Sequence, residues 1–187
     1  MDNTIHSLIE AHIETIKLLK NSSDTIKRIA LLFIDALKKN NKIIFFGNGG
    51  SAADAQHLSA ELIGRFKKNR QPLASIALNT NTSIITAVGN DFGEEHIFSY
   101  QIEALAKRGD IAVGISTSGN SKNVITAVLK AKEKGITTVG FLGNDGGKLV
   151  NLVDISLLVD SNDTARIQEA HILTGHIICE IIENEIF

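Results

Sequence analysis

Short, continuously apolar runs alternate with longer amphipathic stretches along most of the chain. Five runs, at 43–46, 73–78, 111–115, 136–142 and 155–159, have the length and composition of strands buried on both faces of a sheet. Between these runs, apolar residues recur every three or four positions, which is typical of helices with one buried face. Strands that alternate with helices in this way predict right-handed crossovers. We therefore expect an α/β fold with a doubly wound, five-stranded parallel sheet and helices on both faces.

The amphipathic stretches predict the helices, two of which precede the first strand. Within residues 1–40, Asn21–Asp24 separates a helix over 4–20 from a second helix with its own apolar face. A minimal α/β domain does not need these N-terminal helices, so we expect oligomer contacts there, with packing on the chain's own sheet as the alternative. After the first strand, one helix is predicted to begin near Ser51. Further helices are predicted over 82–88, 94–107, 121–134 and about 164–182, with a turn at Gly89–Gly93.

Length and composition fit one domain over residues 1–187, because no linker or low-complexity tract divides the chain. The formal net charge of -2 gives no general attraction to nucleic acid or to an anionic membrane, so any phosphate recognition has to be local. A single cysteine, Cys179, excludes an internal disulfide and suits a reducing compartment. Neither a signal pattern nor an apolar run of membrane-spanning length occurs, so we expect a cytoplasmic protein.

The first apolar run leads into a glycine-rich turn at 47–50. Glycine lets the backbone turn sharply and leaves room for a ligand beside the main chain. Ser51 and Asp54 have the spacing of a capping box, which predicts that a helix starts near Ser51. A strand, a glycine turn and a helix N-terminus together favour an anion site, because unpaired N–H groups and the helix dipole face the turn.

This turn also matches a relaxed dinucleotide fingerprint, Gly47-x-Gly49-x-x-Ala52. That function requires an acidic residue at the end of the second strand to hold the ribose, and Leu78-Asn79-Thr80 offers none. A P-loop is excluded because no Gly-Lys-Ser/Thr follows the turn. We therefore expect a phosphorylated metabolite at the turn and no nucleotide cofactor.

A second polar segment, Ser116–Ser121, lies where the third strand hands over to a helix. Its hydroxyls and N–H groups can surround a phosphate monoester, although a capped turn uses the same residue types. His57 and Glu61 are four residues apart and share one helix face, which is also compatible with an ordinary surface pair. In the last helix, His171 and His176 stand among apolar residues, where a histidine is more often a core or interface residue than a ligand.

Several motifs together resemble those of the sugar isomerase (SIS) domain and, within it, the bacterial phosphoheptose isomerases. They run in order across nearly the whole chain, and their joint occurrence is specific although each alone would be weak. The matching segments are Gly47–His57, Gly89–Gly93, Gly114–Ser121, Asp145–Gly147 and Ala165–His171.

The resemblance implies interconversion of D-sedoheptulose 7-phosphate and D-glycero-D-manno-heptose 7-phosphate, the first step of bacterial ADP- or GDP-heptose synthesis. Such an isomerisation moves a proton between C1 and C2 through an enediol, so it needs a base near the carbons and an acid near the oxygens. By analogy, Glu61 is the expected base and His176 the expected acid. The positions implied to bind substrate are Asn48, Gly49, Gly50, Ser51, Glu61, Asn90, Asp91, Ser116, Thr117, Ser118, Ser121 and Gln168.

Members of the family also hold zinc, and the resemblance implies one Zn²⁺ per subunit at His57, Glu61, Gln168 and His176. Gln168 and His176 are roughly 12 Å apart along a helix at ~1.5 Å per residue, which is awkward for two ligands of one ion. Either the ligands come from more than one subunit, or the helix is distorted, or one residue binds indirectly. The family forms tetramers with shared active sites, so the resemblance implies a homotetramer and favours the first option.

Two alternatives come from the same resemblance. Non-catalytic SIS proteins that bind the replication initiator DnaA share several motifs, but their positions matching Glu61 and His176 lack the acid and the imidazole, and this chain has both. Isomerases of other sugar phosphates, such as arabinose 5-phosphate, usually carry additional regulatory domains. The motifs therefore favour a phosphoheptose isomerase, while sugar length and stereochemistry depend on the shape of the pocket.

Overall fold

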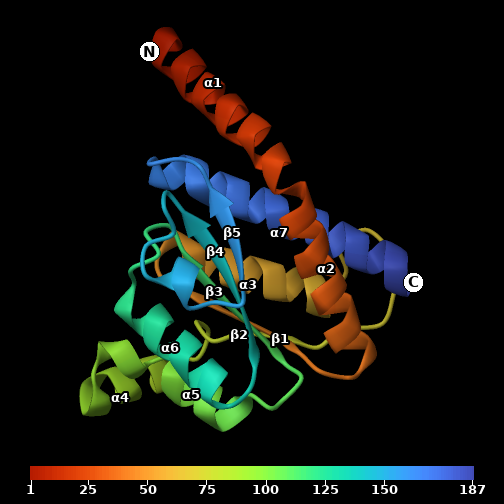
Figure 1. Cartoon of the computed structure of the whole chain (residues 1–187), viewed down its shortest axis with the longest axis vertical. Coiled ribbons are helices and arrows are strands. Elements are labelled where there is room, and N and C mark those ends of the chain that lie inside the picture. The colour runs from red at the N-terminus through yellow and green to blue at the C-terminus, as the bar shows by residue number, and fades with distance from the viewer.

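The five predicted strands form one parallel sheet in the computed structural model, which describes all 187 residues. The strands are β1 (Ile43–Gly47), β2 (Ser75–Ala77), β3 (Ile111–Ser116), β4 (Thr137–Gly143) and β5 (Ile155–Val159) (Figure 1). Their order in the sheet is β2-β1-β3-β4-β5, so the winding direction reverses between β1 and β3. The predicted α/β fold with a doubly wound parallel sheet is confirmed, and ligands are expected at the carboxyl ends of β1 and β3.

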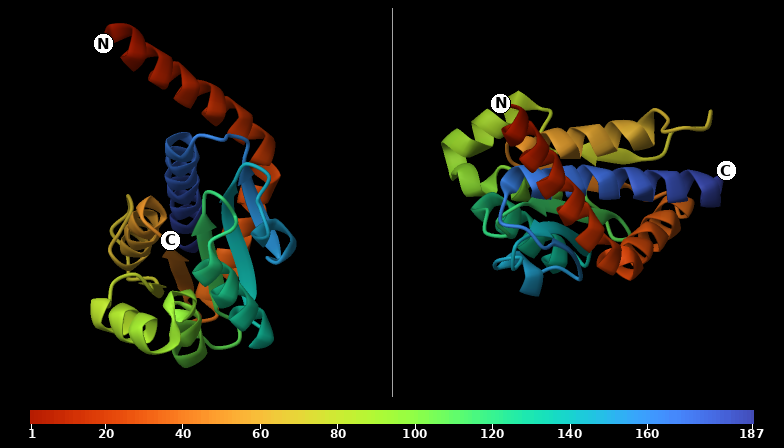
Figure 2. Two further views of the ribbon diagram at one scale, coloured as in Figure 1. Left: turned by 90° about the vertical axis from the view of Figure 1, so that its left-hand side faces the viewer. Right: turned by 90° about the horizontal axis from the view of Figure 1, so that it is seen from above.

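Helices cover both faces of the sheet (Figure 2). They are α1 (Asp2–Leu19), α2 (Ser23–Lys38), α3 (Gly50–Ile63), α4 (Thr82–Phe92), α5 (Ser99–Leu105), α6 (Lys122–Glu133) and α7 (Thr164–Ile186). The sheet divides the apolar core into two clusters. Along β1, Ile43 and Phe45 belong to the cluster that includes α2, α3 and α7, whereas Ile44 and Phe46 belong to the cluster that includes α5 and α6. No helix combines the length and the apolarity that a membrane crossing requires.

Helix α3 begins one residue before the predicted capping residue. Gly49 precedes its first turn with a φ of 55°, a left-handed conformation that favours glycine. Ser51 is buried inside the helix and makes no side-chain cap, so the predicted capping box is wrong. Its expected partner, Asp54, has one carboxylate oxygen buried without a hydrogen-bond partner. Burial raises the pKa of Asp54 to about 6, against the opposing effect of His57.

Two other local predictions also differ from the structure. The turn expected at Gly89–Gly93 is wrong, because α4 continues to Phe92 and ends only where Gly93 adopts a φ of 101°. A lone glycine inside a helix costs only about 1 kcal/mol, so Gly89 does not end α4. The helix expected over 94–107 is interrupted, since a 3-10 turn at Glu94–His96 precedes α5.

Helix α1 projects from the body of the molecule, and its N-terminal half lies away from the sheet (Figures 1 and 2). Its apolar residues face solvent, with exposed fractions of 54% for Ile5, 49% for Leu8 and 51% for Ile9. One anchor to the rest of the chain is the His12 imidazole, whose Nδ1 lies 2.7 Å from the Glu169 carboxylate on α7. Helix α2, in contrast, packs into the core. The two N-terminal helices therefore differ, and α1 presents an apolar face that this chain leaves uncovered.

His171 is a core residue, in agreement with the expectation for a histidine among apolar neighbours. It is fully buried, its Nε2 lies 3.2 Å from the carbonyl oxygen of Leu142, and its Nδ1 has no partner. Burial lowers its pKa to about 4, although the bond to the Leu142 carbonyl opposes the shift.

Acid should destabilise the fold through His171. Its pKa falls from 6.5 to about 4 on folding, so the contribution to stability is complete above about pH 6.5 and is lost as the pH falls toward 4. The loss at pH 4 is on the order of 3 kcal/mol, at about 1.4 kcal/mol per pKa unit. Urea denaturation at pH 7 and pH 4.5 should show the free energy of unfolding falling less in His171→Leu than in the wild type. Equal losses in the two proteins would contradict this role.

Candidate functional site

The polar loop after β3 has the features of an anion site. The hydroxyls of Ser116 and Ser121 lie 3.0 Å apart and close the loop across its base. Gly119 adopts a φ of 62° and lies so close to the backbone of Gly146 that a Cβ would clash with its carbonyl. Helix α6 starts directly after the loop and its first turn has no side-chain cap, so its N–H groups and dipole favour an anion there. Thr117 and Ser118 lie in the same loop, partly or fully exposed.

The glycine turn after β1 lies next to this loop, because β1 and β3 are adjacent in the sheet. Asn48 at this turn and Asn123 in the first turn of α6 exchange two side-chain hydrogen bonds of 2.8 and 2.9 Å. The side chain of Gln168, from the first turns of α7, lies so close to Gly50 that a Cβ there would clash with its amide. Three segments that are distant in the sequence therefore meet above the carboxyl edge of the sheet.

Two surface cavities open beside these loops. One of about 500 Å³ is lined by Asn48, Ile85, Thr86, Gly89, Asn90, Glu94, Ile97 and Asn123. The other, of about 340 Å³, is lined by Asn48, Glu94, Glu95, Ser121, Lys122 and Asn123. Asn90 thus faces a cavity, whereas Asp91 accepts a hydrogen bond from the Asn90 amide at 2.7 Å. We did not predict from the sequence that Asn123 and Lys122 line these cavities, although their position directly after the Ser116–Ser121 loop could have indicated it.

A second polar group forms around His57, Glu61 and His176. The Glu61 carboxylate lies 3.0 Å from Nε2 of His57, and the same nitrogen lies 3.1 Å from Nε2 of His176. His57 and Glu61 are one turn apart on α3, and His176 comes from α7, which packs directly on α3. Gly175 permits this approach, because a Cβ there would clash with the side chain of Leu58. His57 and His176, 119 positions apart, are thereby brought into contact, and a side-chain atom of Glu61 lies within 4.8 Å of one of His176.

The electrostatic environment of this group favours a neutral His176 imidazole at neutral pH. Burial lowers the pKa of His176, the nearby His57 lowers it further, and Glu61 opposes both. The ring of Phe66 stacks on the His176 ring with centroids 5.3 Å apart and an interplanar angle of 29°. A neutral imidazole is the form that binds a metal ion or passes a proton from one ring nitrogen to the other.

The same three residues fit a metal ion. One ligand atom from each of His57, Glu61 and His176 lies within 4.8 Å of the other two. Ligands of a tetrahedral zinc ion at about 2.0–2.1 Å lie roughly 3.3 Å from one another, which is close to the observed separations. Two nitrogens and one carboxylate also form a donor set that suits zinc. Gln168 is not part of this arrangement, because its side chain lies at the other end of α3, against Gly50.

The predicted site residues therefore fall into two groups within one chain. The loops after β1 and β3, with Asn90 and Gln168, form one group, and His57, Glu61 and His176 form the other. Gly50 and Glu61 are at opposite ends of α3, about 16 Å apart along the helix at ~1.5 Å per residue. The candidate phosphate loop and the candidate acid–base group thus do not meet in a single copy of the chain.

Comparison with known proteins finds phosphoheptose isomerases that match nearly the whole chain. A family model described as the SIS domain matches residues 9–143. The chain is 53% identical to the phosphoheptose isomerase of Aliarcobacter butzleri over 94% of each protein. It is 50% identical to the phosphoheptose isomerase of Clostridium acetobutylicum, over 100% of this chain and 97% of that protein. The solved structure of the phosphoheptose isomerase from Neisseria gonorrhoeae matches with a TM-score of 0.93 and 41% identity over 98% of each chain.

Proposed function

Because the chain belongs to the phosphoheptose isomerases of the SIS-domain family, we propose that it interconverts D-sedoheptulose 7-phosphate and D-glycero-D-manno-heptose 7-phosphate. The observation that carries the proposal is that Glu61, His57 and His176 lie together, although they come from two helices that are far apart in the sequence. A carboxylate beside imidazoles provides the general base and the general acid that an aldose–ketose isomerisation needs. The product would enter ADP- or GDP-heptose synthesis in the cytoplasm, where a lone cysteine stays reduced.

The proposed mechanism divides the reaction between the two groups. The phosphate would be held by hydroxyls and N–H groups of the Ser116–Ser121 loop and the start of α6, with the turn at 48–51 beside it. Glu61 would remove a proton from one carbon and return it to the neighbouring carbon of the enediol. His176 would move the proton between the two oxygens through Nδ1, because its Nε2 faces His57 and the proposed metal position. Asn90, Asp91 and Gln168 would contact sugar hydroxyls.

We also propose that the complete site forms between copies of the chain. The two groups lie at opposite ends of α3, so a substrate held by one loop would meet the Glu61 group of a neighbouring copy. The uncovered apolar face of α1 supplies a surface for such an assembly. Closed symmetric assemblies use the same patch on every copy, which suits a homotetramer with shared sites.

Zinc is proposed as the metal of this site, one ion per subunit. His57, Glu61 and His176 would hold it, and bound zinc would polarise the oxygens of the substrate. Helix α7 is continuous from Thr164 to Ile186, which argues against a distortion that would bring Gln168 to the same ion. Gln168 would therefore reach the metal from another copy or contact only the sugar.

Incubation of the purified protein with sedoheptulose 7-phosphate tests the proposed function. The aldose product should accumulate until the reaction reaches equilibrium, as followed by ion chromatography. Removal of zinc with a chelator, verified by elemental analysis, should lower the rate, and added Zn²⁺ should restore it. Full activity without metal would exclude a catalytic role for zinc. Absence of turnover together with binding of the replication initiator DnaA would instead favour the non-catalytic alternative.

A further inference from the structure

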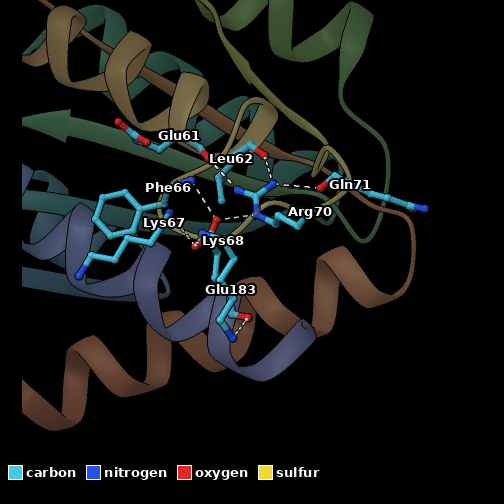
Figure 3. Close-up of polar contacts among 8 residues, drawn as sticks. All are labelled: Glu61, Leu62, Phe66, Lys67, Lys68, Arg70, Gln71 and Glu183. Carbon is cyan, nitrogen blue, oxygen red and sulfur yellow. Dashed lines mark hydrogen bonds and ion pairs between the residues drawn. The ribbon is translucent and has the colours of Figure 1, made fainter.

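A buried ion pair between Arg70 and Glu183 lies where α3 and α7 end, close to Glu61 (Figure 3). Nε of Arg70 lies 2.7 Å from the Glu183 carboxylate, and the two side chains are only 1% and 2% exposed. Glu183 lies two helical turns after His176 on α7, and Arg70 lies in the loop between α3 and β2. The mechanism proposed above assigns no role to either residue.

The carboxylate of Glu183 anchors that loop. It accepts backbone N–H groups from Phe66, Lys67 and Lys68 at 2.8 to 2.9 Å (Figure 3). Within residues 65–72, no backbone N–H bonds to another backbone group, so these three bonds hold the loop in place. Burial would raise the pKa of Glu183, but the three N–H groups and Arg70 lower it to about 2, so the carboxylate is charged at neutral pH.

The guanidinium of Arg70 binds the end of α3. Its two terminal nitrogens donate to the carbonyl oxygens of Glu61 and Leu62 at 2.8 and 2.9 Å (Figure 3). The last carbonyls of a helix lack partners within the helix, and a cation there complements the helix dipole. One of the two carbonyls belongs to Glu61 itself, so the backbone of the proposed base is fixed by this contact.

The loop also reaches the proposed acid. Phe66, whose N–H is held by Glu183, stacks its ring on the imidazole of His176. One carboxylate on α7 therefore controls both partners, His176 through Phe66 and Glu61 through Arg70. Because a displacement of about 1 Å in reacting groups can cost 100-fold in rate, such a connection matters for turnover.

We propose that the Arg70–Glu183 pair is a positioning device that sets Glu61 and His176 at the distance required for proton transfer. This inference rests on the proposed isomerase function for its kinetic consequence, but its structural consequence stands alone. Glu183 and Arg70 touch no reacting atom and act through the Glu61 backbone and the Phe66 ring. Replacing either residue should therefore change kcat and leave the KM for the sugar phosphate nearly unchanged, because the phosphate loop lies at the other end of α3.

Glu183→Gln removes the charge of the carboxylate. Arg70→Lys keeps the positive charge but removes the paired hydrogen bonds from the guanidinium to the Glu61 and Leu62 carbonyls. We expect each variant to lower kcat by about 10- to 100-fold and to change KM by less than about twofold. Asp110→Asn is the matched control. Asp110 is also fully buried, accepts the N–H groups of Lys42 and Lys107 and pairs with Nζ of Lys42, but none of these residues belongs to α3, α7 or the loop between α3 and β2. The Asp110→Asn variant should lose about as much thermal stability as Glu183→Gln and should retain the wild-type kcat.

NMR of the metal-free protein supplies a readout that does not depend on turnover. The Phe66 ring shifts the His176 ring-proton resonances, so Glu183→Gln should move them and Asp110→Asn should not. Unmoved His176 resonances in Glu183→Gln would overturn the inference even if the wild type is an active isomerase. Moved resonances with no turnover in the wild type would instead reject the proposed function alone. Should Glu183→Gln fail to fold, Arg70→Lys decides, and an unchanged kcat in that variant would overturn the inference.

Discussion

Replacing Glu61 by glutamine should lower kcat for sedoheptulose 7-phosphate isomerisation by about 10²–10⁴-fold, the usual contribution of a positioned general base. Glutamine keeps the shape of the side chain and can still accept a hydrogen bond from His57, but it cannot take up a proton. The carboxylate touches only the imidazole group, so the fold should be retained. Progress curves at saturating substrate, with circular dichroism of both proteins, measure the effect.

A matched control for this variant is Glu180→Gln. Glu180 pairs with Lys67 on the surface, close to the same loop, and takes no part in the imidazole group. Its replacement should leave kcat within about twofold, because exposed ion pairs contribute at most about 1 kcal/mol. An active Glu61→Gln enzyme would require a different base, and His57 would be the first alternative because it shares the cluster.

Two inactive variants should restore each other's activity if the site is shared between copies. Ser118→Asp would place a negative charge in the exposed phosphate loop, and Glu61→Gln would remove the base from the other end of α3. In oligomers formed by co-expression, about a quarter of the sites would combine an intact loop from one copy with an intact base from another. The mixed preparation should therefore regain about a quarter of the wild-type kcat, whereas each variant alone stays inactive.

The control mixture combines Glu61→Gln with His176→Gln. These residues lie in the same cluster of one chain, so every site in the mixed oligomer carries a defect and no activity should return. Equal recovery in the two mixtures, or recovery in neither, would contradict the shared site. A fully active monomer in light scattering would also exclude it.

The secondary structure was largely predictable because burial leaves a local pattern. The fifth strand was predicted at 155–159 and is observed at Ile155–Val159, since a short continuous apolar run is typical of a strand inside a parallel sheet. Gly135, directly after the helix predicted over 121–134, adopts a φ of 67°, a conformation typical of a glycine that follows a helix C-terminus. The errors at Ser51 and Gly89–Gly93 arose where residue types that favour caps and turns occur inside helices, and neighbouring packing overrode the local preference.

The candidate site was predictable only in part. The motifs named the residues, and the structure brings His57, Glu61 and His176 together, while their catalytic and metal-binding roles remain proposals. Gln168 lies apart from these three, as its spacing from His176 along one helix indicates, and the loops after β1 and β3 lie apart from Glu61. The contact of Arg70 with Glu183 joins residues 113 positions apart and has no signal in the sequence.

By itself, the sequence determined the alternation of strands and helices, the class of fold, and a set of polar residues at the ends of strands. These properties depend on periodicity and on local backbone preferences, which a few neighbouring residues encode. Only the tertiary structure decided the strand order, the close approach of α3 to α7, and the separation of the phosphate loop from Glu61. Such relations depend on how whole helices pack across the sheet, because many side chains jointly determine each packing distance.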